Sequence, residues 1–228
     1  DYHEWAALRA ESRAFLEPWE PRWSPDELDR STWRSRISRY REDFAHGSAL
    51  PFFLFENSGG KLAGGITLGN IRHGVAQSGQ IGYWIGERYA GKGLMLEGLQ
   101  LLVGHAFQTL RLHRVEAACI PDNRRSIRVL EKAGFRREGL LRSYLRINGR
   151  WQDHYLYAVI AGDGRGGSGA EGCCVAEGHA GSPVLLRAGR AVGAAFGHGL
   201  ELRRRADQDR ARRRGARPFG SGRDLPQP

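Results

Sequence analysis

Cysteine is scarce in this sequence, with three cysteines among 228 residues, two of them adjacent at Cys173 and Cys174. This number and spacing indicate neither a disulfide framework nor a zinc site. Long apolar runs are also lacking, since none approaches the roughly 20 residues of a membrane-spanning helix. The first five residues have neither the basic region nor the apolar stretch of a secretory signal. We therefore expect a soluble, cytoplasmic protein without a metal.

Tryptophan and tyrosine are absent from the C-terminal part, because all six Trp and all seven Tyr lie within residues 1–161. Residues 162–228 instead hold 15 of the 32 glycines, and 12 arginines against 7 acidic residues. Such a composition buries too little apolar surface to offset chain entropy. We predict that 1–161 forms the folded domain. We predict that 162–228 is a disordered tail with at most one helix, over 183–202.

Lysine is nearly absent, with 3 lysines against 32 arginines, which indicates a GC-rich coding sequence. A frameshift origin of the tail is therefore a hypothesis that the nucleotide sequence decides. The net charge of +10 leaves open a second class of function, a nucleic-acid- or ribosome-binding protein. In that case the arginine clusters at 203–205 and 212–214 would bind phosphates without sequence specificity.

The hydrophobic pattern of 1–161 predicts a mixed α/β domain with the element order α α β β β α β α β β. Ser24, followed by Pro25 and Glu27, is expected to be the N-cap of the second helix. Asn148 and Gly149 predict a hairpin turn. The helices are expected at Tyr2–Leu16, Ser24–His46, Gly91–Leu110 and Arg124–Ala133, and the strands at Pro51–Glu56, Lys61–His73, Gln80–Ile85, Arg114–Ile120, Phe135–Ile147 and Trp151–Ile160.

A glycine-rich segment, Gly86 to Gly93, joins the third strand to the third helix. Such a turn exposes backbone N–H groups beside the positive end of the helix dipole and favours a phosphate or pyrophosphate. Neither the dinucleotide spacing G-x-G-x-x-G nor the P-loop spacing G-x-x-x-x-G-K-[ST] occurs there. We expect a different anionic ligand, and the alternative is a helix start with glycines for tight packing.

The elements after this loop resemble a known family. A strand is followed by Pro121-Asp122-Asn123-Arg124-Arg125-Ser126 and by a helix ending in Lys132-Ala133-Gly134-Phe135. This succession resembles the GNAT acyltransferase superfamily, with its [QR]-x-x-G-x-[GA] loop and its N-x-x-[SA] helix start. The resemblance covers 1–161 and implies a further strand before Asp1. Four segments are similar to the ribosomal-protein-alanine N-acetyltransferase branch: Gly82–Gly86, Leu112–Ala117, Gly134–Gly139 and Asn148–His154.

The resemblance implies a GNAT-like fold, in which a mostly antiparallel sheet with flanking helices opens between Gln80–Ile85 and Arg114–Ile120. It also implies acetyl-CoA as the acyl donor, with the pantetheine arm in the gap and the thioester carbonyl on a backbone N–H near Ile85. The loop pattern fits in two registers: Arg88 with Gly91 and Gly93, or Ala90 with Gly93 and Met95.

We prefer the second register, which keeps the family's distance from the strand end to the loop. Lys92 is then either a phosphate ligand or a solvated lysine. Asn123 is either a CoA contact or a helix N-cap. The residues expected to bind acetyl-CoA are Ile85, Ala90, Gly91, Lys92, Gly93, Leu94, Met95 and Asn123.

The resemblance implies an amine acceptor, most simply the N-terminal α-amine of a ribosomal protein. Attack on a thioester requires a neutral amine, and an α-amine with a pKa of about 7.7–8.0 is neutral far more often than a lysine side chain near 10.4. A weak base is therefore sufficient. A small-molecule amine is the alternative acceptor.

The base and the phenolic acid that the resemblance implies are missing, because Ala118 and Leu130 stand at those positions. Glu116 shares the strand face of Ala118 and is the first candidate base. Weaker candidates are Glu20, Asp153 and His154.

Ser126 is expected either to donate a hydrogen bond to the leaving CoA thiolate or to bond its own backbone. The segment Phe15 to Pro21 is expected either to wall the acceptor site or to be a proline-stiffened turn with Trp19 in the core.

Overall fold

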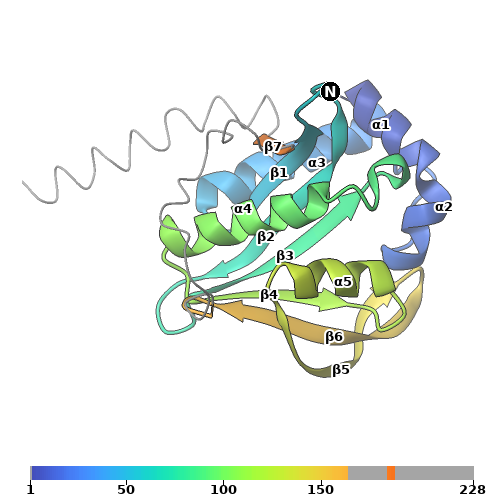
Figure 1. Ribbon diagram of the computed structural model, residues 1–228. Coiled ribbons are helices and arrows are strands. Elements are labelled where there is room, and N and C mark those ends of the chain that lie inside the picture. The colour runs from blue at the N-terminus through green and yellow to red at the C-terminus, as the bar shows by residue number, and fades with distance from the viewer. Residues whose placement is uncertain (1, 164–183, 188–228) are drawn as a thin grey trace, which may run out of the picture. The chain divides into compact units, whose positions relative to one another are not determined.

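The structure is a computed structural model that describes residues 2–163 and the backbone of 184–187. One seven-stranded sheet has the order β5-β6-β4-β3-β2-β1-β7, with helices on both faces (Figure 1). Its strands are β1 (Leu50–Glu56), β2 (Leu62–Arg72), β3 (Ser78–Ile85), β4 (Arg114–Cys119), β5 (Arg136–Ile147), β6 (Arg150–Ile160) and β7 (Val184–Arg187). The helices are α1 (Tyr2–Glu11), α2 (Arg13–Leu16), α3 (Arg30–His46), α4 (Leu94–Gln108) and α5 (Arg124–Lys132), with 3-10 turns η1 (Glu17–Trp19) and η2 (Glu87–Tyr89).

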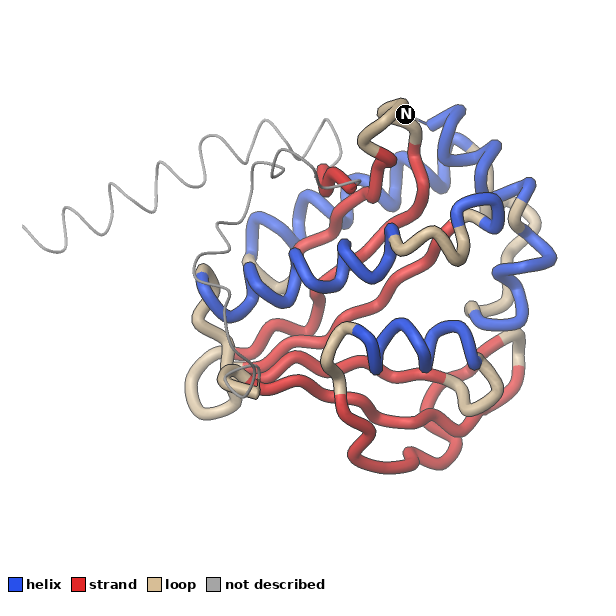
Figure 2. The backbone as a smooth tube through the Cα atoms, in the orientation of Figure 1, coloured by secondary structure: helices blue, strands red, loops and turns tan. Residues whose placement is uncertain are grey.

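The sheet is antiparallel except where β3 and β4 pair in parallel. A parallel pair needs a crossover connection, because the chain must return to the starting edge, and α4 provides it. Figure 2 shows α4 and α5 on one face of the sheet and α3 on the other. The predicted fold class, a mixed α/β domain with a mostly antiparallel sheet, is confirmed.

The strand β7 differs from the sequence prediction, which had six strands and a tail without fixed structure. Val184–Arg187 pairs antiparallel with β1, where Phe53 faces Arg187 and Glu56 faces Val184. The prediction used the average composition of the tail, which is rich in glycine, and so missed this short Val-Leu-Leu run with its high β-propensity. It satisfies the open hydrogen-bonding edge that β1 would otherwise present. The rest of the tail from 164 on lies outside the described residues.

The first predicted helix is broken at Ser12, whose hydroxyl oxygen accepts a hydrogen bond from the Glu87 N–H (2.9 Å). This contact ties the break between α1 and α2 to the segment that follows β3. One continuous helix over 2–16 was therefore wrong.

The second predicted helix begins later than expected, because α3 starts at Arg30 with Asp29 as its N-cap. The Ser24 carbonyl instead accepts a turn hydrogen bond from the Glu27 N–H (3.1 Å). The Glu27 carboxylate binds Arg36 (2.5 Å) and so does not complete a capping box. The predicted end at His46 is confirmed.

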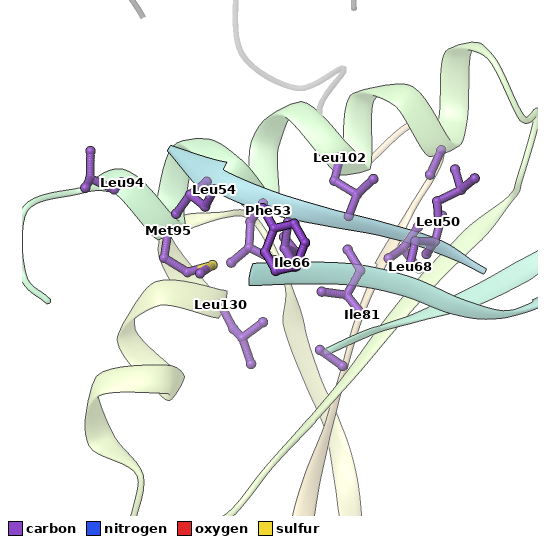
Figure 3. Packing of buried hydrophobic residues seen from close by; sticks show 14 of the residues in the cluster. Leu50, Phe53, Leu54, Ile66, Leu68, Ile81, Leu94, Met95, Leu102 and Leu130 are labelled. Carbon is purple, nitrogen blue, oxygen red and sulfur yellow. The ribbon is translucent and has the colours of Figure 1, made fainter. Parts of the chain in front are cut away.

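The core lies mainly between α4 and the strands β1 to β3. Leu94, Met95 and Leu102 of α4 are each at most 4% exposed. Burying one such side chain contributes roughly 1.5–3 kcal/mol, so this packing fixes where α4 begins. Figure 3 shows these side chains against Leu50, Phe53, Leu54, Ile66, Leu68 and Ile81, with Leu130 of α5 beside them.

Within residues 2–163 and 184–187, no helix is long and apolar enough to cross a membrane. The same residues contain no group of three His, Cys, Asp or Glu side chains that could hold a metal ion.

Candidate active site

The parallel strands β3 and β4 separate after a short paired stretch. Their last pair is Ile81 opposite Ala117. Beyond it, β3 runs on to Ile85 and β4 to Cys119 without pairing to each other. The sheet therefore opens between these strands, as predicted, and α4 and α5 both begin at this edge because each follows one of them (Figure 1).

The free end of β3 directs backbone N–H groups into this gap. The Gly86 N–H donates to the Ala63 carbonyl oxygen of β2 (2.8 Å). Along an antiparallel strand, alternate residues turn their N–H toward opposite neighbours. The N–H groups of Ile85 and Tyr83 therefore face away from β2, into the gap. The Ile85 N–H therefore points to where an acceptor in the gap would lie.

The first turn of α4 has N–H groups without intrahelical partners. Gly93 is the N-cap and gives no side-chain cap, and the first helical bond runs from the Glu97 N–H to the Gly93 carbonyl (3.1 Å). The N–H groups of Leu94, Met95 and Leu96 precede that bond and have no acceptor within the helix. Together with the helix dipole they form a site suited to an anion.

The loop glycines are explained by backbone conformation. Gly91 and Gly93 have φ values of 79° and 83°, a region that other residues enter with strain. A Cβ at either position would meet no atom within 4 Å. The space beside this backbone is therefore open, which tight packing would not require.

Two basic side chains make cation–π contacts with the buried ring of Tyr89. The Arg88 guanidinium is 5.1 Å and the Lys92 ammonium 5.4 Å from its centroid. Arg88 also pairs with Glu11 of α1 (3.0 Å). Both side chains of this ion pair are about half exposed, and the two loop glycines with positive φ, Gly91 and Gly93, are those of the register that begins at Arg88. Lys92 is exposed beside the α4 N-terminus.

Ser126 of α5 faces β3 across the gap. Asn123 is the N-cap of α5, since its Oδ1 accepts the Ser126 N–H (3.1 Å). The Ser126 hydroxyl meets the Tyr83 hydroxyl at 2.7 Å. Burial raises the pKa of the Tyr83 phenol above its ordinary value, so it stays neutral. Burial likewise raises the pKa of the nearby Cys119 thiol.

Glu116 lies one step inside the paired region, opposite Gln80. Its carboxylate accepts hydrogen bonds from Arg114 Nε (2.7 Å) and from Gln80 Nε2 (3.4 Å). Arg114 also binds Glu138 of β5. Glu116 shares the face of Ala118, as alternation predicted. The structure thus places the first candidate base near the gap, but within an ion-pair network.

The three weaker base candidates are also engaged. Both Glu20 oxygens accept hydrogen bonds from Arg9 (3.1 and 2.6 Å), and Oε2 accepts another from Trp23 Nε1 (2.8 Å). Asp153 accepts the Ser143 N–H (2.8 Å) at an irregularity of β5. His154 is buried, and its Nδ1 meets the Gln152 carbonyl oxygen (2.9 Å), which leaves Nε2 as the basic nitrogen of the neutral ring.

The segment Phe15 to Pro21 lies beside both α5 and the β5–β6 turn. The Phe15 ring is 4.9 Å from the Arg125 guanidinium, and the Glu20 carbonyl accepts the Asn148 N–H (2.9 Å). Trp19 is half-buried and stands outside the core. An open cavity of about 670 Å³ adjoins the segment, lined by Arg13, Glu17, Arg22, Trp23, Ser24, Pro25 and Asn148.

Two site residues were missed at the sequence level. Tyr83 appeared only within a matched segment, and Arg9 only as part of an amphipathic helix. The Arg9 guanidinium is buried 4.4 Å from the Trp23 ring and 5.0 Å from the Trp84 ring. Trp23 and Trp84 are far apart in the sequence, which therefore gave no signal that their rings lie beside one cation.

This chain is similar to known proteins in sequence and in structure. The family model described as the acetyltransferase (GNAT) domain matches residues 1–136. The probable N-acetyltransferase YjcK of Bacillus subtilis is 38% identical over 163 residues, covering 72% of this chain and 90% of that protein. The ribosomal protein uS5-alanine N-acetyltransferase of Escherichia coli is 36% identical over 154 residues, covering 68% and 79%.

Among solved structures, Mycobacterium smegmatis RimJ in complex with CoA-disulfide is similar with a TM-score of 0.67 and 38% identity. The likeness covers 71% of this chain and 78% of that one. The family match spans every element that borders the gap between β3 and β4, from α1 to α5.

Proposed function

This chain belongs to the GNAT acetyltransferase family, and on that basis we propose that it transfers the acetyl group of acetyl-CoA to the N-terminal α-amine of a protein. The observation that carries this proposal is the gap between β3 and β4. It combines the N–H groups of the free end of β3 with the N–H groups at the start of α4. A ligand with a carbonyl at one end and a pyrophosphate further along would accept hydrogen bonds from both sets of N–H groups.

The residues of this chain fit acetyl-CoA as the acyl donor. The pyrophosphate would accept N–H groups from the segment Ala90 to Met95, where Gly91 and Gly93 leave room, with Lys92 as a counter-charge. The thioester carbonyl would accept the Ile85 N–H, which stabilises the negative charge that develops on that oxygen. Asn123, held as the α5 N-cap, keeps its side-chain NH₂ for the pantetheine arm.

The catalytic residues that we propose are Glu116 and Ser126. Glu116 would accept the amine proton, directly or through water, and Ser126 would donate a hydrogen bond to the departing sulfur. Glu116 is already ion-paired with Arg114, so it suits an acceptor that needs little help. An α-amine is such an acceptor, because its pKa of about 7.7–8.0 leaves an appreciable neutral fraction.

A ribosomal protein is the acceptor that we favour. This choice is supported by the uS5-alanine N-acetyltransferase of Escherichia coli, a 36% identical relative. Such an acceptor would place the reaction in the cytoplasm. No described contact favours nucleic acid as a partner, and the arginine clusters at 203–205 and 212–214 lie outside the described residues.

The experiment incubates the full chain with acetyl-CoA and peptides that copy ribosomal-protein N-termini, starting with Ala, Ser or Met. Mass spectrometry is expected to find one added acetyl group at the N-terminus. The same peptides with a blocked N-terminus and one internal lysine are the matched control. Acetylation of the control in preference to the free N-termini refutes the α-amine proposal.

A further inference from the structure

The hydroxyl groups of Tyr83 and Ser126 meet across the open part of the sheet. Their oxygens are 2.7 Å apart. Tyr83 lies two residues past Ile81, where the pairing of β3 with β4 ends, and Ser126 is in the first turn of α5. This bond therefore joins the free end of β3 directly to α5.

Either hydroxyl can be the donor in this hydrogen bond. The Ser126 N–H is taken by the Asn123 side chain, so the start of α5 is held in place. A serine hydroxyl has one hydrogen to donate and two lone pairs. The phenol of Tyr83 stays protonated because burial opposes its ionisation. When Tyr83 donates to Ser126 Oγ, the single Ser126 hydrogen is left for a third group.

We infer that Tyr83 is a positioning residue, whose hydroxyl donates to Ser126 Oγ and thereby directs the Ser126 O–H toward the sulfur that leaves during transfer. The inference rests on the proposed function, which supplies that sulfur. During transfer a C–N bond forms as the C–S bond breaks. The sulfur keeps the electron pair and leaves as a thiol after taking up a proton, while the amine nitrogen loses one. The Ser126 O–H stabilises the sulfur as negative charge develops on it, and Tyr83 holds that O–H in the direction of the sulfur.

The spacing along β3 agrees with this role. Tyr83 and Ile85 point the same way, two residues and about 7 Å apart. The oxygen and sulfur of a thioester are attached to one carbon, so the groups that serve them must come from neighbouring positions. The Ile85 N–H serves the oxygen, and Tyr83 reaches the sulfur through Ser126.

A second hydroxyl provides a matched control. Tyr157 of β6 donates to the Glu131 carboxylate near the end of α5 (3.2 Å). This bond also ties the sheet to α5, but it does not reach Ser126. Tyr157→Phe therefore removes a sheet-to-helix hydroxyl bond while leaving the serine untouched.

The test is a double-mutant cycle in the full chain, with acetyl-CoA and an Ala-starting peptide. We expect Tyr83→Phe to lower kcat by about tenfold, the effect of one lost hydrogen bond, with the KM for acetyl-CoA unchanged. Ser126→Ala should lower kcat at least as much. Adding Tyr83→Phe to Ser126→Ala should have no further effect, because Tyr83 acts through the serine. Tyr157→Phe should leave kcat unchanged.

Three results would overturn the inference: additive losses in the double variant, an equal loss in Tyr157→Phe, or a wild-type kcat in Tyr83→Phe. Should Tyr83→Phe not fold, the cycle is run with 4-methylphenylalanine and 4-aminophenylalanine at position 83, which fill the place of the hydroxyl without and with a donor. The amino form should hold kcat within about threefold of wild type and the methyl form should not. Equal kcat values for the two forms then count against the positioning role. A wild-type chain that acetylates no peptide refutes the proposed function and this inference with it.

Discussion

Arg9 holds Glu20 by both carboxylate oxygens, with nitrogen-to-oxygen distances of 3.1 and 2.6 Å. The Arg9 side chain is 5% exposed and that of Glu20 19%. An anion held in this way neutralises a buried cation, and both of its oxygens already accept hydrogen bonds. The pair joins α1 to the segment Phe15 to Pro21, so its role is to hold that segment against the helix.

Glu20→Gln should therefore lower stability more than activity. Arg9 would lose its charge-assisted hydrogen bonds to Glu20 and keep Glu27, 3.9 Å away, as counter-charge, so we expect a loss of about 1.5–3 kcal/mol, measured by urea unfolding. The control is Glu17→Gln, which breaks the exposed pair of Glu17 with Arg13 and should cost under about 1 kcal/mol. Equal losses for both variants would show that Glu27 alone compensates Arg9.

Gly93→Val should raise the KM for acetyl-CoA steeply, because the new side chain fills the open space beside the α4 N-terminus. The positive φ adds a folding cost of about 1–2 kcal/mol. Gly74 shares that cost, since its φ is 71° and a Cβ there would also meet no atom within 4 Å, but it lies in the β2–β3 turn. Gly74→Val should leave the KM for acetyl-CoA unchanged. If Gly93→Val also leaves it unchanged, the pyrophosphate does not bind at the start of α4.

Glu116→Gln should lower kcat by no more than the roughly 10²–10⁴-fold of one acid–base group, with partial rescue at high pH as the neutral amine becomes abundant. The measurement is the pH profile of kcat/KM with an Ala-starting peptide. Glu138→Gln is the control, since Glu138 shares Arg114 with Glu116. Profiles that coincide for wild type and Glu116→Gln remove Glu116 from the mechanism.

Stability should fall as the pH drops below about 6.5, partly because of His105 in α4. Desolvation lowers the pKa of His105 below the 6.5 of the unfolded chain, so the unfolded state takes up the proton first. Between the two pKa values the loss is up to about 1.4 kcal/mol per pH unit. His105→Leu should flatten the pH dependence of the unfolding free energy between pH 7 and 5, whereas His73→Leu, at an exposed turn, should not.

A chain that ends at Ala161 tests the predicted domain boundary. It should still bind acetyl-CoA, because every proposed contact lies between Ile85 and Ser126. It also lacks β7 and exposes the edge of β1, an apolar strand open to pairing with other chains. We therefore expect more aggregation, by light scattering, than for a chain ending at Arg187. Equal light scattering from the two chains would show that β7 does not protect the edge of β1 from aggregation.

The sequence predicted the order and type of ten elements of the sheet and its helices, because period and turn residues act locally. It did not predict the interruption of the first helix at Ser12, whose hydroxyl accepts a hydrogen bond from the Glu87 N–H, 75 residues away in sequence. It missed β7 because composition averages over a long segment. Near the gap, the resemblance to the GNAT superfamily pointed to Ser126 and Asn123, but not to Tyr83, which meets Ser126 because two strands separate there.

The pairing of β3 with β4 extends over four residue pairs, and it joins two antiparallel ribbons that are each contiguous in sequence, β1 to β3 and β4 to β6. Contacts within the β1 to β3 meander and within the β5–β6 hairpin are local and should form first during folding. Both pairings of β4 join residues at least 36 positions apart in the sequence, so β4 should join the sheet late. We expect the four pairs of the β3–β4 junction to open while the pairs on either side stay intact. The amide protons of Ile81 and Glu116 face across this junction, because the Arg114 N–H donates to the Gln77 carbonyl oxygen and alternate residues share that direction. They should exchange with solvent faster than amide protons of the β1–β2 and β5–β6 pairs, so the gap borders the part of the sheet that opens first.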